Sequence, residues 1–409
     1  MQLQWTPDQL RLRGLYQEIG REMSVRPRAT DAFDQSAWDA VRAAGLWRLI
    51  VPAELGGDGR DWWGFTSALE GLASSLRAPG ILLSIIAQAG MVRALDRFGT
   101  EAQKKYYLPR ILAGELTATA IADPDTGTDV RATSSILTPQ ANETFALNGS
   151  KYNIAHAPVA GFILVICKLD DHERSGISLA LVDASMPGVH AGPRDDKLGN
   201  RDLPTGSLRF EDVRLDYGHM LGVPGEGLRN LVDIVSLGRL YYGLVAAAML
   251  EPMLAEALAY AQQRETFGVP ILEHQHVQRR LTDICIGMES GKWVAYGALS
   301  RLLAGTPDSV MLCSIAKLVG ADAVVDSALD LLRLYGSKGY HEGPVTDFLR
   351  NALAFCAVGG TDEMHRRNIM NQMIRLAPKA GAVSDRAVKP AHPDRDAKPS
   401  PVPVQAAVA

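Results

Sequence analysis

The 409-residue sequence has few cysteines and no long apolar run. Its four cysteines are far apart and form no Cys-x-x-Cys pair, which argues against a zinc site or a disulfide framework. The longest apolar runs are far below the roughly 18 residues that a membrane-spanning helix needs. The N-terminus has no basic segment followed by an apolar stretch, so we expect no secretory signal and a cytoplasmic protein without a membrane partner.

An excess of charge of one sign is also missing. The formal net charge is −4 and the isoelectric point is about 6.2, so there is no electrostatic case for binding nucleic acid. No Gly-x-Gly-x-x-Gly follows an expected strand, and no Gly-Lys-Ser/Thr loop is present. We therefore expect neither a Rossmann nor a P-loop nucleotide site, and we expect no metal site.

The sequence does contain two changes of hydrophobic period. Residues 1–116 carry apolar positions at helical spacing, whereas residues 117–226 carry short runs that are separated by turn signals. Residues 227–376 return to long helical patterns that are typical of a bundle. We expect a mainly α protein with a central β-barrel or sandwich, between an N-terminal α-helical domain and a C-terminal four-helix bundle. The Pro-rich and Ala-rich residues 377–409 predict a disordered tail.

Several segments resemble motifs of the acyl-CoA dehydrogenase flavoprotein family. They occur in the family's order, and the resemblance extends over about residues 5–376. A single match of this kind would be weak, but six in the right order and spacing are specific. The matching segments are Val51–Gly57, Ala122–Asp129, Leu208–Arg214 with Gly225–Gly227, Arg264–Gly268 with His274–Gln275, Tyr335–Tyr340, and Arg350–Ala352.

The resemblance implies an acyl-CoA dehydrogenase-like fold, bound FAD and a homotetramer or dimer. Thr128, Ser236 and Arg239 match positions near the acyl thioester or its pantetheine arm. A diphosphate suits a guanidinium fork and backbone N–H donors, which Arg264 and the turn at 336–339 would supply. The positions that match the family's flavin contacts are Ala122, Gly127, Thr128, Asn153, Ile154, Ala155, Arg264, Thr266, Phe267, Gln275, Arg333, Gly336, Ser337, Thr361 and Glu363.

The chain departs from the family at the catalytic base. The family's glutamate usually stands before Gly-Thr in the last helical segment, where this sequence has Gly359, or before an arginine on an earlier bundle helix, where it has Gly238. Neither glycine can accept a proton, and general-base assistance is worth about 10²–10⁴-fold in rate. We expect the missing side chains to open space beside the flavin.

The flavin surroundings depart as well. Asn153 stands where the family has tryptophan, Ala155 where it has threonine, and Arg333 where it has glutamine. A backbone N–H at Gly359 would still be able to polarise a thioester carbonyl, because that donor needs no side chain.

No residue is singled out as a replacement base. His156 and Asp123 are weak candidates, and His156 has an ordinary pKa suited to the task. The alternative for His156, which we favour, is a polar residue beside the end of a strand. Tyr241 is a further candidate, because it lies close to the matched motifs. Asp362 and Glu363 are better explained as FAD contacts or surface groups.

Three functions stay open on the sequence. The first is an FAD-dependent oxidoreductase that acts on an acyl thioester of coenzyme A or an acyl-carrier protein, with a displaced base or none. We associate such altered sites with specialised metabolite biosynthesis. The second is a flavin-dependent monooxygenase or oxidase on the same fold, supplied with electrons by a separate flavin reductase. The third is a non-catalytic subunit that holds FAD in a heteromeric dehydrogenase. The acyl group and the electron acceptor are not predicted.

Overall fold

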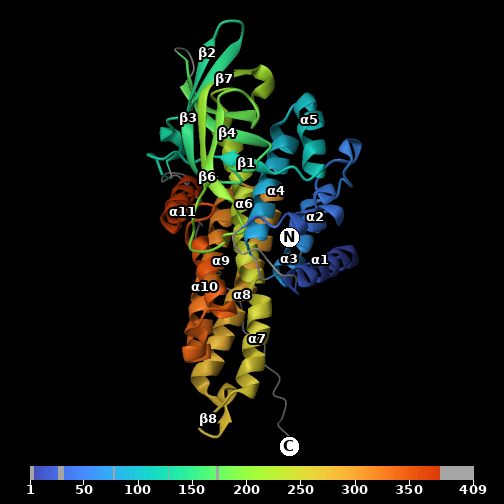
Figure 1. The fold of residues 1–409 in the computed structure, drawn as a ribbon, viewed down its shortest axis with the longest axis vertical. Coiled ribbons are helices and arrows are strands. Elements are labelled where there is room, and N and C mark those ends of the chain that lie inside the picture. The colour runs from blue at the N-terminus through green and yellow to red at the C-terminus, as the bar shows by residue number, and fades with distance from the viewer. Residues whose placement is uncertain (1–3, 26–31, 77–78, 128, 172–174, 378–409) are drawn as a thin grey trace, which may run out of the picture.

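A computed structural model of the chain describes residues 4–25, 32–76, 79–127, 129–171 and 175–377. Apart from Ala377, the expected tail lies outside the described residues. The molecule is elongated, with a β-sheet at one end, a long helical bundle at the other, and a group of N-terminal helices against their junction (Figure 1).

The N-terminal part is helical, as the spacing of its apolar residues predicts. Side-chain caps start three of its helices: Asp34 and Asp61 each accept a backbone N–H, and Thr100 forms a reciprocal capping box with Gln103. The helices are α1 (Pro7–Val25), α2 (Gln35–Ala43), α3 (Trp62–Ala73), α4 (Pro79–Phe98) and α5 (Glu101–Leu112), with short 3-10 turns η1 (Trp47–Leu49) and η2 (Ala53–Leu55).

The middle part forms one curled seven-stranded sheet, which confirms the expected central β unit. Strand β4 (Phe162–Asp170) pairs in parallel with β1 and β2 and antiparallel with β5, and the order continues from β2 through β3 and β7 to β6. The other elements are β1 (Thr117–Ala120), β2 (Ile136–Gln140), β3 (Thr144–Ala155), β5 (Ser175–Asp183), β6 (Val189–Arg194), β7 (Thr205–Asp216), η3 (Val130–Ala132) and η4 (Tyr217–His219).

Strand β4 lies between two apolar cores. Phe162 and Leu164 pack into the core shared with the helices, whereas Ile163 and Val165 pack into a second core inside the curled sheet. Successive strand side chains point to opposite faces, so a strand that is buried on both sides reads as one continuous apolar run. This arrangement attaches the sheet to the helical part.

The C-terminal part is dominated by four long helices. Helices α6 and α9 approach so closely that a Cβ on Gly243 would lie 2.1 Å from the carbonyl oxygen of Ala316, and a Cβ on Gly320 would lie 2.3 Å from that of Gly243. Glycine is therefore required at this crossing. The elements are α6 (Gly227–Ala248), α7 (Leu250–Gln263), α8 (Gln275–Leu303), α9 (Ser309–Tyr335), α10 (Pro344–Ala352), α11 (Asp362–Leu376), the strands β8 (Glu265–Thr266) and β9 (Val269–Pro270), and the 3-10 turns η5 (Ile271–Glu273), η6 (Gly336–Tyr340) and η7 (Leu353–Cys356).

The stretch Gly227–Gln263, which contains α6 and α7, is by length and composition apolar enough to cross a membrane. Of its most apolar window, 56% is buried inside the protein. Residues of α6 such as Leu237, Leu240 and Leu244 are fully buried in the shared core. Core packing thus accounts for the apolar character of this helix.

Candidate active site

The loop after β1 and the end of β3 carry the first group of expected flavin contacts. The backbone N–H of Tyr152 donates to the carbonyl of Ala122 at 2.8 Å, which joins the loop to the strand. The pairing of β3 with β7 shifts register before Ile154, so this part of the strand is bulged. Asn153 in the bulge is exposed and left-handed, with φ 52°, whereas Ile154 is buried and Ala155 half-buried. The structure therefore brings Ala122 and Asn153 together.

The loop continues to Gly127, which is exposed. A Cβ there would meet no atom within 4 Å, so the loop leaves open space at this position. Thr128, which the sequence assigns to both flavin and substrate, lies outside the described residues.

Asp123 belongs to a buried ion pair. Its carboxylate accepts from Lys151 Nζ, Thr133 Oγ1 and the backbone N–H of Ser134, and the side chains of Asp123 and Lys151 are both 0% exposed. Burial opposes the charge, but the hydrogen bonds from Lys151 and Thr133 hold the pKa of Asp123 below its ordinary value. These contacts give Asp123 a structural role and leave it poorly placed to accept a substrate proton.

His156 lies in the core beside aromatic rings. Its side chain is 0% exposed, its Nδ1 lies 2.8 Å from the carbonyl oxygen of Thr117, and the rings of Phe33 and Trp38 pack near it. Burial lowers the pKa of His156 to about 4, so the imidazole is neutral at pH 7. The geometry supports the structural interpretation of His156 over its use as a base.

Tyr241 also points into the core. Its ring is fully buried, its hydroxyl lies 2.9 Å from Thr66 Oγ1, and burial raises its pKa. The neighbouring Tyr242 points in another direction, towards the two glycines at the expected positions of the base.

The ring of Tyr242 lies against both Gly238 and Gly359. A Cβ on Gly359 would lie 2.5 Å from Tyr242 Cδ2, and a Cβ on Gly238 would lie 3.7 Å from Tyr242 Cε2 and 3.9 Å from Ile86 Cγ2. Gly359 lies in the turn before α11, far from α6 in the sequence. Folding brings it against Tyr242 of that helix. The expectation that the glycines open a free space is wrong in this respect, because an aromatic ring occupies the region between them.

Tyr242 is a site residue that the sequence reasoning missed. It is half-buried, and its hydroxyl forms no hydrogen bond with the described part of the chain. Burial raises the pKa of Tyr242 to about 12, so the phenol is protonated at neutral pH. A usable signal was present, because Tyr242 follows Gly238 by four residues and therefore lies on the same face of α6.

Arg239 and His365 carry polar atoms that are unsatisfied among the described residues, and His365 Nε2 would lie 3.2 Å from a Cβ on Gly360, next to Gly359. Arg239 Nε has no hydrogen-bond partner among the described residues, and its Nη2 contacts the thioether of Met364 at 3.8 Å. His365 is 0% exposed, and neither ring nitrogen has a hydrogen-bond partner there. Burial, and then the charges of Arg239 and Lys317, lower the pKa of His365 to about 3. His365 is thus a neutral imidazole beside a guanidinium.

Ser236 differs from its neighbour Arg239. Its side chain is fully buried, and its hydroxyl donates back to the carbonyl of Val232 at 2.7 Å within α6. The geometry therefore gives Ser236 a local helical contact, whereas Arg239 keeps the capacity to bind.

The start of α11 closes this side of the site. Thr361 caps the helix by accepting the backbone N–H of Met364. Asp362 pairs with the buried ammonium of Lys317 at 2.7 Å, and Glu363 is exposed. The carboxylate nearest in sequence to Gly359 thus already neutralises a cation.

A second group of expected flavin contacts lies on the hairpin between α7 and α8. Thr266 Oγ1 lies 3.1 Å from Nε2 of His274, next to the exposed Gln275. Arg264 is exposed and forms no ion pair within the described ranges. Phe267 is 98% exposed and has φ 54°, which is uncommon for a bulky residue.

Arg333, Gly336 and Ser337 are exposed at the end of α9, close to this hairpin. The rings of Tyr260 and Tyr335 stack with their centroids 4.4 Å apart, which joins the end of α7 to the end of α9. The two segments therefore form one exposed surface, although Arg333 also bonds Asp330 at 3.1 Å.

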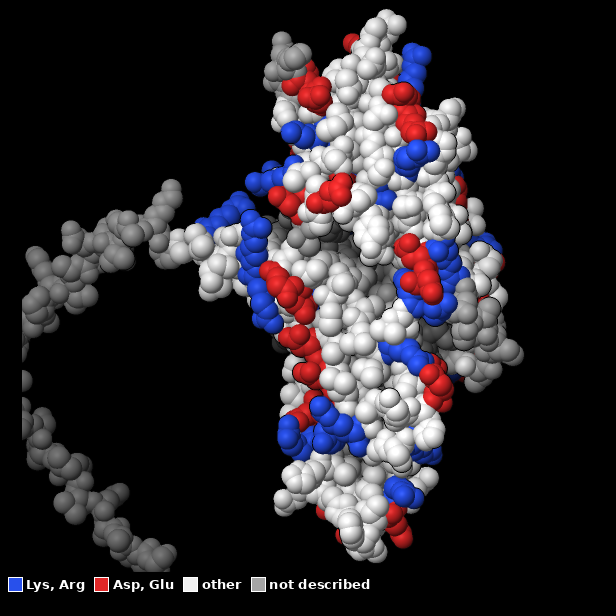
Figure 2. Space-filling model, turned by 60° about the vertical axis from the view of Figure 1, so that its left-hand side comes forward, with Lys and Arg blue, Asp and Glu red and all other residues white. Residues whose placement is uncertain are grey.

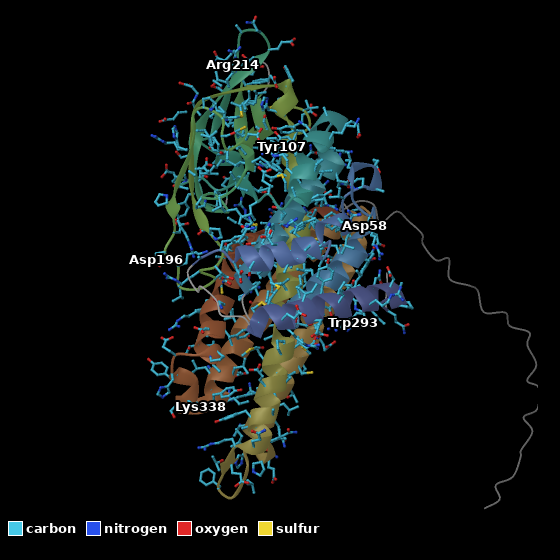
Figure 3. All side chains as sticks on the ribbon, turned by 45° about the vertical axis from the view of Figure 1, so that its right-hand side comes forward. Asp58, Tyr107, Asp196, Arg214, Trp293 and Lys338 are labelled. Atoms are coloured by element: carbon cyan, nitrogen blue, oxygen red, sulfur yellow. The ribbon has the colours of Figure 1, made fainter. Side chains whose placement is uncertain are left out.

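The two groups lie far apart in one copy of the chain. Figure 1 shows β8 at the end of the bundle opposite the sheet, and Figure 3 places Lys338 of η6 in the lower bundle and Arg214 of β7 near the top of the sheet. Figure 2 shows a recess between the sheet and the bundle, next to the helix that leads to the C-terminus.

The chemical types of the residues in the two groups suit FAD. The unpaired Arg264 suits a diphosphate, the exposed Phe267 offers a ring for stacking, and Gly127 with Asn153 leaves open backbone beside the sheet.

A cavity of about 650 Å³ lies elsewhere, between loop 197–202, α4, α7 and α10. None of the expected site residues lines it, so the site is not identified by cavity size.

Comparison with known protein families is consistent with this geometry. Three family models of acyl-CoA dehydrogenases match in the order of the chain: the N-terminal domain at residues 6–115, the middle domain at 118–213 and the C-terminal domain at 225–374.

Individual relatives match nearly end to end. An acyl-CoA dehydrogenase of Bacillus subtilis (strain 168) is 29% identical over 90% of this chain and 98% of its own. A 3-sulfinopropanoyl-CoA desulfinase of Cupriavidus necator is 28% identical over 90% of this chain and 94% of its own.

Solved structures share the fold. Butyryl-CoA dehydrogenase from Megasphaera elsdenii is 27% identical, with a TM-score of 0.84, over 92% of this chain and 100% of its own. The prolyl acyl carrier protein oxidase AnaB is 23% identical, with a TM-score of 0.86, over 90% of this chain and 99% of its own. The chain therefore belongs to the acyl-CoA dehydrogenase family, and it is an FAD-dependent oxidoreductase.

Proposed function

We propose that this flavoprotein oxidises an acyl thioester, carried by coenzyme A or an acyl-carrier protein, without a glutamate as the acceptor of the α-proton. The observation that carries the proposal is the pair of glycines, Gly238 and Gly359, on either side of the ring of Tyr242. Bound FAD supplies a two-electron acceptor for this chemistry.

The groups around the glycines support a site without an enzymatic carboxylate base. Asp362 is paired with Lys317, and the phenol of Tyr242 stays protonated at neutral pH because burial raises its pKa to about 12, so no phenolate is available to accept a proton. His365 is enclosed, and its pKa of about 3 makes it a poor proton acceptor. The α-proton would therefore have to pass to a basic group of the substrate itself or to water.

The backbone retains a donor for the thioester. The N–H of Gly360 already donates to the carbonyl of Ala357 at 3.1 Å, whereas the N–H of Gly359 donates to no described residue. A free backbone donor can stabilise negative charge on a thioester oxygen. We assign this role to Gly359.

The names of the relatives support thioester substrates and a broader range of reactions than dehydrogenation. The Bacillus subtilis relative is named as an acyl-CoA dehydrogenase, and the Cupriavidus necator relative is named for removal of a sulfinate from a coenzyme A thioester. AnaB, named for a carrier-protein substrate, shares the fold. We therefore include both carriers in the test.

We also propose that the active form is a homodimer or homotetramer. The strands β8 and β9 next to Arg264 lie at the end of the bundle far from the sheet whose strand β3 carries Asn153, so one complete FAD site needs two copies (Figure 1). Light scattering on the holoprotein, combined with its FAD content, tests this proposal. A monomer that binds one FAD with full occupancy would contradict it.

The activity is tested by anaerobic titration of the holoprotein with acyl thioesters on coenzyme A and on an acyl-carrier protein. We expect the flavin absorbance near 450 nm to bleach with a subset of the thioesters. No bleaching across both carriers would reject the proposal. Product formation that requires oxygen and a flavin reductase would instead indicate a monooxygenase.

A further inference from the structure

The guanidinium of Arg239 has no anionic partner in the described part of the chain. Its Nε forms no hydrogen bond, and the contact of Nη2 at 3.8 Å is with the neutral sulfur of Met364. Arginine stays protonated in proteins, so this charge persists at all relevant pH values. A half-buried cation without a partner is costly, and such groups are normally paired.

The groups packed around Arg239 do not neutralise it. His365, on α11, is neutral, and Cys313, on α9, is a buried thiol whose pKa burial raises to about 12. Lys317, also on α9, is a second cation, but Asp362 pairs with it at 2.7 Å. The local charge is therefore positive, and Arg239 is the uncompensated member.

Among the described residues, the part of the wall formed by Gly238, Gly359 and Tyr242 carries no acidic side chain. Gly238 precedes Arg239 on α6, and Gly359 faces the same helix through the ring of Tyr242. A neutral phenol and two glycines stand next to an unpaired guanidinium. An incoming anion would therefore gain the charge of Arg239 without repulsion from a carboxylate at either glycine.

We propose that Arg239 binds a free carboxylate on the acyl part of the substrate, so that the preferred substrate is the monothioester of a dicarboxylic acid. This inference rests on the proposed function of the same site. The guanidinium fork matches a carboxylate in a bidentate manner, and the contact forms in partly buried surroundings where it is strong. The diphosphate of FAD is the other anion available, and the exposed Arg264 provides for it at a different place in the fold.

The test is equilibrium binding to the FAD-loaded protein under anaerobic conditions. The probes are malonyl, succinyl and glutaryl thioesters and their methyl esters, each presented on coenzyme A and on an acyl-carrier protein. Calorimetry and perturbation of the flavin spectrum measure the dissociation constants. We expect at least one carboxylate to bind tenfold or more tightly than its methyl ester.

Arg239→Gln should abolish this preference, while affinity for the methyl esters changes less than threefold and FAD content is retained. Arg229→Gln is the matched control, because Arg229 is an exposed residue of the same helix. If Arg239→Gln does not fold, Arg239→Lys replaces it. Lysine keeps the positive charge but lacks the planar fork that binds a carboxylate in a bidentate manner, so the preference should fall at least threefold.

The outcomes separate this inference from the proposed function. Equal binding of carboxylates and methyl esters, together with bleaching by neutral thioesters, would overturn the role of Arg239 and leave the proposed function in place. A preference that survives Arg239→Gln would also overturn it. Loss of FAD from Arg239→Gln would mean that the guanidinium serves the cofactor. Failure of every thioester to bind or bleach would overturn both proposals.

Discussion

The backbone of Gly359 lies against the ring of Tyr242, so that a Cβ at 359 would be 2.5 Å from Tyr242 Cδ2. Gly359 also has φ 73°, in the left-handed region that side chains disfavour. Glycine at 359 is thus required by the shape of this site, whereas Gly238 makes no such close approach and has no positive φ.

This difference predicts opposite effects of alanine at the two glycines. Gly359→Ala should lower the free energy of unfolding by roughly 2–4 kcal/mol, because both the left-handed backbone and the ring of Tyr242 oppose a Cβ. Gly238→Ala should raise it by up to about 1 kcal/mol, because alanine favours the interior of a helix. Chemical denaturation of the two variants measures both values, and equal effects would contradict the geometry.

Tyr242 should contribute to stability through its ring and not through its hydroxyl. Tyr242→Phe should change the free energy of unfolding by less than about 0.5 kcal/mol, because the hydroxyl has no hydrogen bond to lose. Tyr242→Ala should lower it by about 3 kcal/mol through the cavity it leaves. Stopped-flow mixing with a thioester compares how fast the flavin absorbance falls in Tyr242→Phe and in the wild type. Equal rates would show that the phenol takes no part in proton transfer.

The buried pair of Asp123 and Lys151 should be costly to break from one side. Asp123→Asn should lower the free energy of unfolding by about 3–5 kcal/mol, because it leaves the ammonium of Lys151 buried without a counter-charge. The double variant Asp123→Asn/Lys151→Met should recover part of this loss. Additive effects in the double-mutant cycle would show that the two charges are not coupled.

Acid should destabilise the protein partly through His156. Its pKa is about 4 in the folded chain and about 6.5 when unfolded, so below pH 6.5 the unfolded state binds the extra proton. This contribution is fully present above pH 6.5 and is lost as the pH falls, by roughly 3 kcal/mol at pH 4. The test variant is His156→Asn, because asparagine tolerates the positive φ at this position. It should lower the slope of the unfolding free energy against pH in this window, by an amount that corresponds to at most one bound proton. An unchanged slope would mean that solvent reaches the imidazole.

Arg264 should matter for FAD and not for the acyl group. Arg264→Gln should raise the dissociation constant of FAD about 10–100-fold, since it removes a charge-assisted contact with the diphosphate. Equilibrium dialysis of the apoprotein with FAD measures the change. The control is Arg229→Gln, which should leave the constant unaltered. A normal FAD affinity in Arg264→Gln would remove the hairpin from the cofactor site.

Much of the fold follows from local sequence signals. Local sequence signals account for the observed limits of α5, Glu101 and Leu112, because Thr100 caps its start and Gly114 follows its end. The apolar run of β4 does not alternate with polar residues, which indicates a strand that is buried on both faces. The expected barrel or sandwich did not specify the pairing of β4 with three strands, because register depends on contacts between segments that are distant in sequence.

The motifs predict flavin contacts at Ala122, Asn153 and Arg264, and these stay predictions. Asn153 and Arg264 are exposed and Ala122 is half-buried. His156 and Asp123 show the limit of that approach. Their chemistry is suited to a base, but burial by Phe33 and Trp38 and pairing with Lys151 are properties of the packed core that no local pattern reveals.

The sequence by itself determined the family, the order of helices and sheet, and the two glycines at 238 and 359. Only the tertiary structure decided which side chains surround these two glycines. Folding brings the turn before α11 against α6, so that Tyr242 lies between the glycines and Arg239 has no counter-charge among the described residues. A side chain's neighbours across the fold set its charge balance and its free space, and these neighbours come from distant parts of the chain.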